Sequence, residues 1–107
     1  MTRKAAGQQV RGSNTGRPIM VLLDVLGQRW TLRILWELIP GPLPFRGLRE
    51  QCDEVSPTVL NARLRALREL GVVDHRDGEG YALTDQGREL GEKLLELNQW
   101  ADHWAGR

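Results

Sequence analysis

Apolar residues recur every three or four positions along most of the chain, which is the spacing of helices that bury one face. The first such segment starts at Pro18, a residue that suits the first position of a helix, and it ends before Gly27. The second runs from Trp30 to Ile39 and carries apolar side chains on two faces before Pro40 ends it. We therefore expect this second helix to lie at the centre of the fold, surrounded by the rest of the chain.

Residues 56–70 carry start and stop signals for one helix. Ser56 can cap its N-terminus by accepting a backbone N–H, and Pro57 suits its first position. Gly71 can adopt the left-handed conformation that closes a helix. One stripe of this helix is apolar and should be buried: Leu60, Leu64 and Leu67.

The opposite face of the same helix is short, polar and basic. Its exposed positions should be Thr58, Asn61, Ala62, Arg65 and Arg68, with Arg63 on the flank. Arginine suits guanine edges, asparagine suits adenine, and hydroxyls at the start of the helix, on Ser56 and Thr58, suit phosphates. This face has the chemistry to enter a DNA major groove, with Asn61 and Arg65 as the candidates for base contacts. An ordinary solvated helix face is the alternative, and the neighbouring elements decide between the two.

A short helix precedes this basic helix. Phe45, Leu48 and Cys52 share one of its faces, and Arg46 and Arg49 lie on the outside. A short helix, a tight connection and a capped basic helix together predict a helix-turn-helix. In that arrangement the two arginines would straddle the DNA backbone, although surface solubility also explains them.

The apolar period changes after the basic helix and predicts a β-hairpin. Residues 72–76 and 81–83 flank Asp77-Gly-Glu-Gly80, which is typical of a hairpin turn. The turn is either two residues, at Asp77-Gly78, or all four. Leu43-Pro44 is expected to add a very short edge strand.

Thr84 is a plausible N-cap for a long last helix that reaches Trp104. The apolar stripe of this helix has no further chain to cover its distal half, and aromatic residues at its end are typical of interface centres. We therefore predict a homodimer built by the first and last helices. Its interface residues would be Ile19, Leu22, Leu23, Leu94, Leu97, Trp100, Ala101 and Trp104. The tryptophans could instead line a pocket for a small-molecule effector at the dimer seam, although packing explains them better.

Length and composition add three limits. The chain of 107 residues suits one domain, with residues 1–16 as a disordered basic N-terminal arm and residues 17–107 as the folded part. The formal net charge is only +1, but residues 1–17 hold four basic residues and no acidic one. Basic charge is therefore local. No apolar run is long enough to span a membrane, and one cysteine cannot form an internal disulfide, so we expect a cytoplasmic protein.

No catalytic or cofactor-binding constellation stands out. Ser56 has no adjacent histidine, and no glycine-rich phosphate loop follows a strand, so we expect no enzyme activity and no cofactor. His75 and His103 are far apart in sequence and show no pattern of metal ligands. Cys52 is expected to be a small buried hydrophobe, with redox sensing as the less favoured alternative.

The expected order of elements is that of a winged helix-turn-helix, a mainly α fold with a small β-hairpin (α+β). Beyond this order, five segments of the chain match a known family pattern: Leu23-Asp-Val-Leu-Gly-Gln-Arg-Trp-Thr-Leu-Arg-Ile-Leu-Trp-Glu-Leu38, Phe45-Arg-Gly-Leu-Arg49, Leu60-Asn-Ala-Arg-Leu-Arg-Ala-Leu67, Gly71-Val-Val73 and Leu83-Thr-Asp-Gln-Gly87. In combination, over roughly residues 17–104, the chain resembles the HxlR family of transcriptional regulators, a MarR-like group. The resemblance implies a cytosolic bacterial homodimer on a pseudo-palindromic operator, with the helix after Ser56 in the major groove and the hairpin as a wing.

Two departures from the family pattern change what the resemblance implies. Family members often carry a cysteine directly before the proline that opens the first helix, sometimes as a sensor of oxidants or electrophiles, whereas this chain has Arg17 there. The wing is also shorter than usual, and Asp77 and Glu79 make its tip acidic. Because acids repel phosphates, we expect only Arg76, at the base of the wing, to approach DNA. A winged-helix module that binds a protein partner and not DNA is the alternative function.

Overall fold

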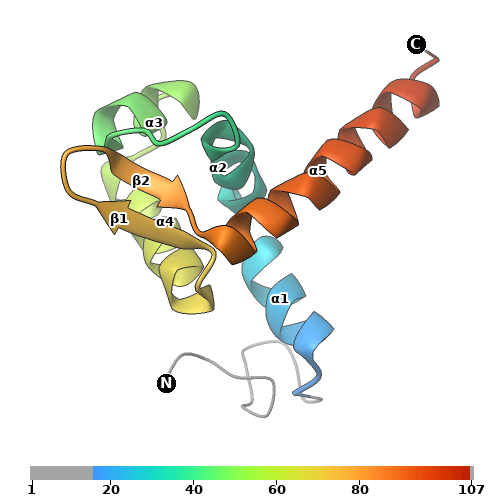
Figure 1. The fold of residues 1–107 in the computed structure, drawn as a ribbon, viewed down its shortest axis with the longest axis horizontal. Coiled ribbons are helices and arrows are strands. Elements are labelled where there is room, and N and C mark those ends of the chain that lie inside the picture. Colours follow the sequence, from blue (N-terminus) through green and yellow to red (C-terminus); the bar gives the residue numbers. More distant parts are fainter. Residues whose placement is uncertain (1–15, 107) are drawn as a thin grey trace.

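The computed structural model describes residues 16–106, and in that range five helices and two strands follow one another (Figure 1). The elements are α1 Pro18–Leu26, α2 Thr31–Leu38, α3 Phe45–Gln51, α4 Pro57–Leu70, β1 Val73–Arg76, β2 Gly80–Leu83 and α5 Asp85–Trp104. The predicted elements and their order are therefore confirmed, with ends that differ by one or two residues. The predicted N-terminal arm falls almost entirely outside the described residues.

The core lies where α2, α3 and α4 meet the sheet. Ile34 and Leu35 of α2, Leu48 of α3 and Leu60 of α4 are all buried in one apolar cluster, which the sheet joins through Leu83. Each helix contributes one stripe to this cluster, which is what the spacing of its apolar residues predicts. The cluster fixes α3 and α4 relative to each other, and so sets the geometry of the helix-turn-helix.

The surroundings of α2 correct one expectation. The sequence predicts a helix covered on all sides, but Leu32 is 40% exposed and Trp36 is 37% exposed. Both line a groove of about 300 Å³ that α5 borders with Leu94 and Leu97. Within this chain α2 is therefore buried on one side only, and its second apolar face is turned toward the groove.

The hairpin is antiparallel, with Val73 opposite Leu83 and Arg76 opposite Gly80. The Glu79 N–H donates to the Arg76 carbonyl oxygen at 3.1 Å and closes a β-turn over residues 76–79, so three residues, 77–79, connect the strands. The loop thus has neither of the two lengths considered from the sequence. The predicted edge strand is present as a single bridge, in which Leu43 exchanges backbone hydrogen bonds with Tyr81.

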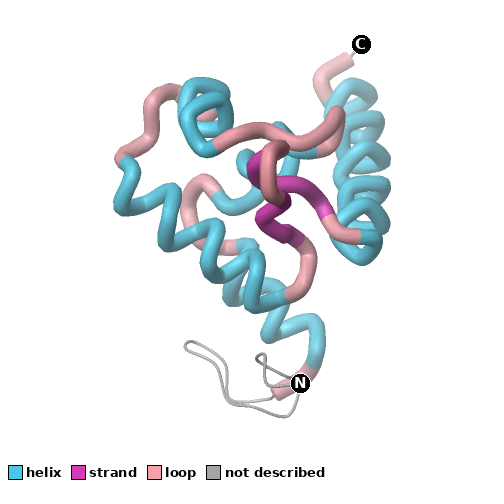
Figure 2. The backbone as a smooth tube through the Cα atoms, turned by 60° about the vertical axis from the view of Figure 1, so that its left-hand side comes forward, coloured by secondary structure: helices cyan, strands magenta, loops and turns pink. Residues whose placement is uncertain are grey.

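Helix α5 begins at a side-chain cap and leaves the body of the molecule along its length. The Thr84 hydroxyl oxygen accepts a hydrogen bond from the Gly87 N–H at 3.1 Å, so the predicted N-cap is confirmed. The first turns of α5 lie beside the sheet, which Figure 2 shows between α4 and α5. The distal half extends away from the other elements in Figure 1. Within the described residues no helix is both long and apolar enough to cross a bilayer.

Candidate nucleic-acid interface

Helix α4 is held at both ends by the residues that the sequence indicated. The Ser56 hydroxyl accepts a hydrogen bond from the Val59 N–H at 3.1 Å. At the other end Gly71 has a left-handed φ of 82°, and its N–H donates to the Arg68 carbonyl oxygen. The next N–H, of Val72, donates to the Leu67 carbonyl oxygen, and the two bonds form the closing motif common at helix C-termini. The length and direction of α4 are therefore set locally.

The two faces of α4 differ as predicted. Its apolar stripe is fully buried against the core. The predicted recognition residues on the other side are exposed: Ser56, Thr58, Asn61, Ala62, Arg65 and Arg68. No other part of the chain described by the structure covers them. The surface that would have to enter a DNA groove is thus open.

Three arginines that the sequence suggested as DNA contacts are engaged within the chain. Arg49 Nε donates to the Val55 carbonyl oxygen at 2.7 Å. Arg63 Nε donates to a backbone carbonyl oxygen in the α1–α2 connection, also at 2.7 Å. Arg76 lies 3.7 Å from the Glu79 carboxylate and contacts the Leu83 carbonyl oxygen at 3.4 Å. The first two are better explained as braces of the fold, and their DNA contacts remain predictions.

Arg46, Arg65 and Arg68 differ from these braces. All three are exposed, and among residues 16–106 none of them forms a hydrogen bond or an ion pair. Asn61, one turn before Arg65, is also exposed and has no such partner in that range. Among residues 16–106, the arginines without an internal partner therefore gather on the helix-turn-helix, where a polyanion could pair with them.

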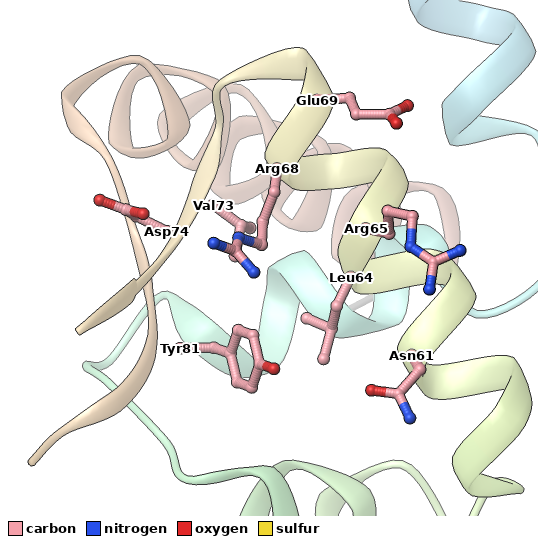
Figure 3. Close-up of a pocket in the computed structure, with 8 residues that line it drawn as sticks. All are labelled: Asn61, Leu64, Arg65, Arg68, Glu69, Val73, Asp74 and Tyr81. Carbon is pink, nitrogen blue, oxygen red and sulfur yellow. The ribbon is translucent and has the colours of Figure 1, made fainter. Parts of the chain in front are cut away.

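A groove of about 460 Å³ separates α4 from the hairpin (Figure 3). It is lined by Asn61, Leu64, Arg65, Arg68 and Glu69 from α4 and by Val73, Asp74 and Tyr81 from the strands. The sequence predicts three of these residues as DNA contacts, Asn61, Arg65 and Arg68, but not Tyr81. The face on which Tyr81 lies follows from the register, which pairs it with His75 and which the sequence left open.

A second surface gathers the residues predicted to form the dimer. In the single chain Leu23 of α1 is 50% exposed, and Trp100 and Trp104 of α5 are 60% and 75% exposed. The two indole rings stack with their centroids 5.8 Å apart. Leu22, Leu94 and Ala101 are partly buried. An apolar surface of this kind is costly in water, because nothing in the described chain covers it.

Cys52 is completely buried among the core side chains. Burial raises the pKa of its thiol, although the nearby Arg33 opposes this shift. The thiol is therefore kept neutral and shielded, which agrees with the expected role as a small hydrophobe. Redox sensing by Cys52 remains untested, and its environment argues against that role because the thiolate is the reactive form.

Comparison with known proteins identifies a family, similar sequences and solved structures with the same fold. Residues 25–107 match the family model described as HxlR-like helix-turn-helix. An HTH-type transcriptional regulator of Mycobacterium tuberculosis is 36% identical over 102 residues, which cover 90% of this chain and 61% of the relative. This chain therefore spans less than two thirds of that relative's length.

Two solved structures share the architecture. A possible HxlR family transcriptional factor from Thermoplasma volcanium aligns with a TM-score of 0.72 and 29% identity, covering 84% of this chain and 86% of the other. The quinone-bound YodB from Bacillus subtilis aligns with a TM-score of 0.71 and 31% identity, covering 80% of this chain and 97% of the other.

Proposed function

The chain belongs to the HxlR-like helix-turn-helix family, and we propose that it is a DNA-binding transcriptional regulator that acts as a homodimer on a pseudo-palindromic operator. Helix α4 enters the major groove of each half-site. Asn61 and Arg65 contact base edges there, while Arg46 and Arg68 contact phosphates. The site of action is the cytoplasm, where bacterial DNA is accessible.

One observation carries this proposal. On the helix-turn-helix, three exposed arginines have no partner within the described residues, whereas Arg33, Arg49 and Arg63 of the same region are all engaged. Unpaired arginines give affinity for DNA because each phosphate contact releases condensed counterions. Glu50 and Glu69 are also exposed on these two helices, but within the described residues neither forms an ion pair with the three arginines.

The dimer supplies the second half of the mechanism. The exposed apolar side chains of α1 and α5 support it, because a second copy would remove them from water. In the proposed dimer the two copies of α4 lie about 34 Å apart, one turn of DNA, so that they read adjacent half-sites. A quinone-type electrophile is not part of the proposal, because the chain has one cysteine and that cysteine is buried.

The experiment is a fluorescence anisotropy titration of the protein against a duplex from the upstream region of its own gene. A scrambled duplex of the same composition is titrated in parallel, each at two salt concentrations. We expect tighter binding to the upstream duplex and a steep loss of affinity with salt. Light scattering on a sizing column should give the mass of two chains, and a monomer at all concentrations would contradict the dimer.

The alternative is a winged-helix module that binds a protein. It is favoured by the acidic tip of the hairpin, where Asp77 and Glu79 are both exposed. Under this alternative neither duplex binds at low salt. That outcome would replace the proposed function by the alternative one.

A further inference from the structure

We propose that the hairpin contacts DNA through Tyr81, whose hydroxyl shares one backbone phosphate with the guanidinium of Arg68. The contact lies in the groove between α4 and the sheet. The inference rests on the proposed DNA-binding function and adds a phosphate site to it. It assigns to Tyr81 the contact that the sequence analysis expected of Arg76.

The ring of Tyr81 is fixed in place by its neighbours on both sides. Its backbone exchanges hydrogen bonds of 2.8 and 2.9 Å with Leu43, and its Cα partner on the other strand is His75. The His75 ring meets the tyrosine ring edge-on, with centroids 4.8 Å apart. The segment at Leu43 therefore holds the backbone of Tyr81 and β1 holds its ring through His75, so the side chain can present its hydroxyl at a defined position.

The hydroxyl of Tyr81 has no hydrogen-bond partner among the described residues. A half-buried phenol is usually satisfied at its polar end by protein, water or ligand. Arg68, which lines the same groove, also has no partner in that part of the chain. Two donors from different elements, neither with a partner among the described residues, thus border one space.

The groove is lined by two guanidinium groups, of Arg65 and Arg68, and by two carboxylates, of Glu69 and Asp74, and these groups point in different directions. Figure 3 shows Arg68 extending from α4 toward the strands, on the side where the Tyr81 ring lies. The carboxylates of Glu69 and Asp74 point to opposite outer sides of the cluster in the same view. A phosphate between Arg68 and Tyr81 would meet donors, and the acids would remain at the rim.

The geometry of DNA explains why this anion is a backbone phosphate. A helix in the major groove is flanked by the sugar–phosphate strands, so the hairpin beside α4 would meet the backbone, whereas Asn61 and Arg65 of α4 itself would face the bases. Arg76 cannot replace Tyr81 there. It pairs with Gly80 in the sheet whereas Tyr81 pairs with His75, so the two side chains lie on opposite faces of the hairpin.

Tyr81→Phe tests the proposal, because it removes only the hydroxyl and keeps the ring on His75. The probe is a fluorescein-labelled duplex of random sequence, so no operator is needed. Tyr81→Phe should weaken binding by about 3- to 10-fold without changing the dependence on salt. Arg68→Gln should weaken it as well and reduce the slope of log K against log salt by about 0.9. The double variant should lose less than the product of the two losses, because both groups serve one phosphate.

Lys93→Gln is the matched control, since it removes one exposed positive charge from α5, away from the helix-turn-helix. It should leave binding almost unchanged. Unfolding curves of all variants should coincide with that of the wild-type protein.

If Tyr81→Phe binds random DNA like the wild type while Arg68→Gln does not, the inference is wrong and the proposed function stands. A Tyr81→Phe loss confined to one selected sequence would also overturn it, because it would indicate base contact. If the wild-type protein binds no duplex, the proposed function itself fails.

Discussion

Arg49 Nε donates a hydrogen bond of 2.7 Å to the carbonyl oxygen of Val55, and this bond ties α3 to the residue just before the cap of α4. In the turn between them, Asp53 and Glu54 have positive φ angles of 58° and 59°. This left-handed conformation is unfavourable for residues other than glycine, so the turn needs support from its surroundings. Arg49 gives part of it, because it also lies 3.2 Å from the Glu54 carboxylate.

Arg49→Ala should therefore act on stability. The variant loses a charged hydrogen bond to a backbone carbonyl in a partly exposed setting, and we expect the free energy of unfolding to fall by about 1–2 kcal/mol. Urea unfolding followed by circular dichroism measures this change. Arg46→Ala, one helical turn earlier, is the matched control, and it should leave the unfolding curve unchanged but weaken binding to random duplex. The reverse pattern would make Arg49 a DNA contact.

Substitutions of Ser56 can distinguish its role as the N-cap of α4 from a contact between this end of the helix and DNA. Ser56→Ala removes the acceptor of the Val59 N–H and should lower the free energy of unfolding by about 1 kcal/mol. Ser56→Asp keeps an acceptor and adds a negative charge at the helix N-terminus, so it should unfold like the wild type. The same carboxylate should weaken duplex binding several-fold because it repels phosphate. Unchanged binding would place the end of α4 away from the DNA backbone.

Gly87 permits the close approach of α5 to the end of α4. A Cβ atom at this position would lie 2.0 Å from the Val72 carbonyl oxygen, which also accepts the Thr84 N–H. We expect Gly87→Ala to destabilise the protein by about 2–4 kcal/mol, because backbone must move to make room. Gly47→Ala is the control, since the nearest atoms there are 3.6 Å away, and it should be neutral or stabilise α3 by about 0.5–1 kcal/mol. Equal effects would show that α5 shifts without cost.

The local features of α4 could be predicted from the sequence because they depend on neighbours in the chain. Ser56 and Gly71 act on backbone groups within four or five residues, and the apolar stripe needs only the helical period. Which arginines are free could not be predicted in the same way. Arg63 bonds to the carbonyl oxygen of Arg29, and nothing in the local sequence of either residue indicates that pairing.

Two further features, the position of Tyr81 and the surroundings of α2, could not be predicted from the sequence for physical reasons. The strand period shows that alternate residues share a face. Which face Tyr81 occupies depends on the length of the hairpin loop, and the glycines and acids of that loop do not determine its length. For α2 the sequence shows two apolar faces and not what covers them. Trp36 is 37% exposed among the described residues, and a helical period does not tell whether other atoms cover such a face.

The burial of Cys52 predicts how the free energy of unfolding depends on pH. Burial raises the pKa of its thiol in the folded protein above the value in the unfolded chain. A group of this kind contributes fully to stability below its unfolded pKa, near 8.5, and the contribution is lost as the pH rises from there through the folded pKa. Urea unfolding from about pH 7 to about pH 10 should show such a decline, and Cys52→Ala should show less of it. A thiol reagent at neutral pH should label the wild-type protein only as fast as it unfolds, and rapid labelling would favour the redox alternative.

Arg65 decides whether α4 reads sequence. It projects from the exposed face one turn after Asn61 and has no partner among the described residues, so its guanidinium is free to bond to a guanine edge. An operator sequence obtained by selection from random DNA provides the substrate. Arg65→Ala should weaken binding to that operator by about 1–3 kcal/mol and relax the preference at one base-pair position. A contact with a phosphate would behave differently, because it would weaken operator and random duplexes equally and lower the salt slope for both. The ratio of the two losses therefore distinguishes base reading from backbone binding, and equal losses would leave Asn61 as the remaining candidate on this face.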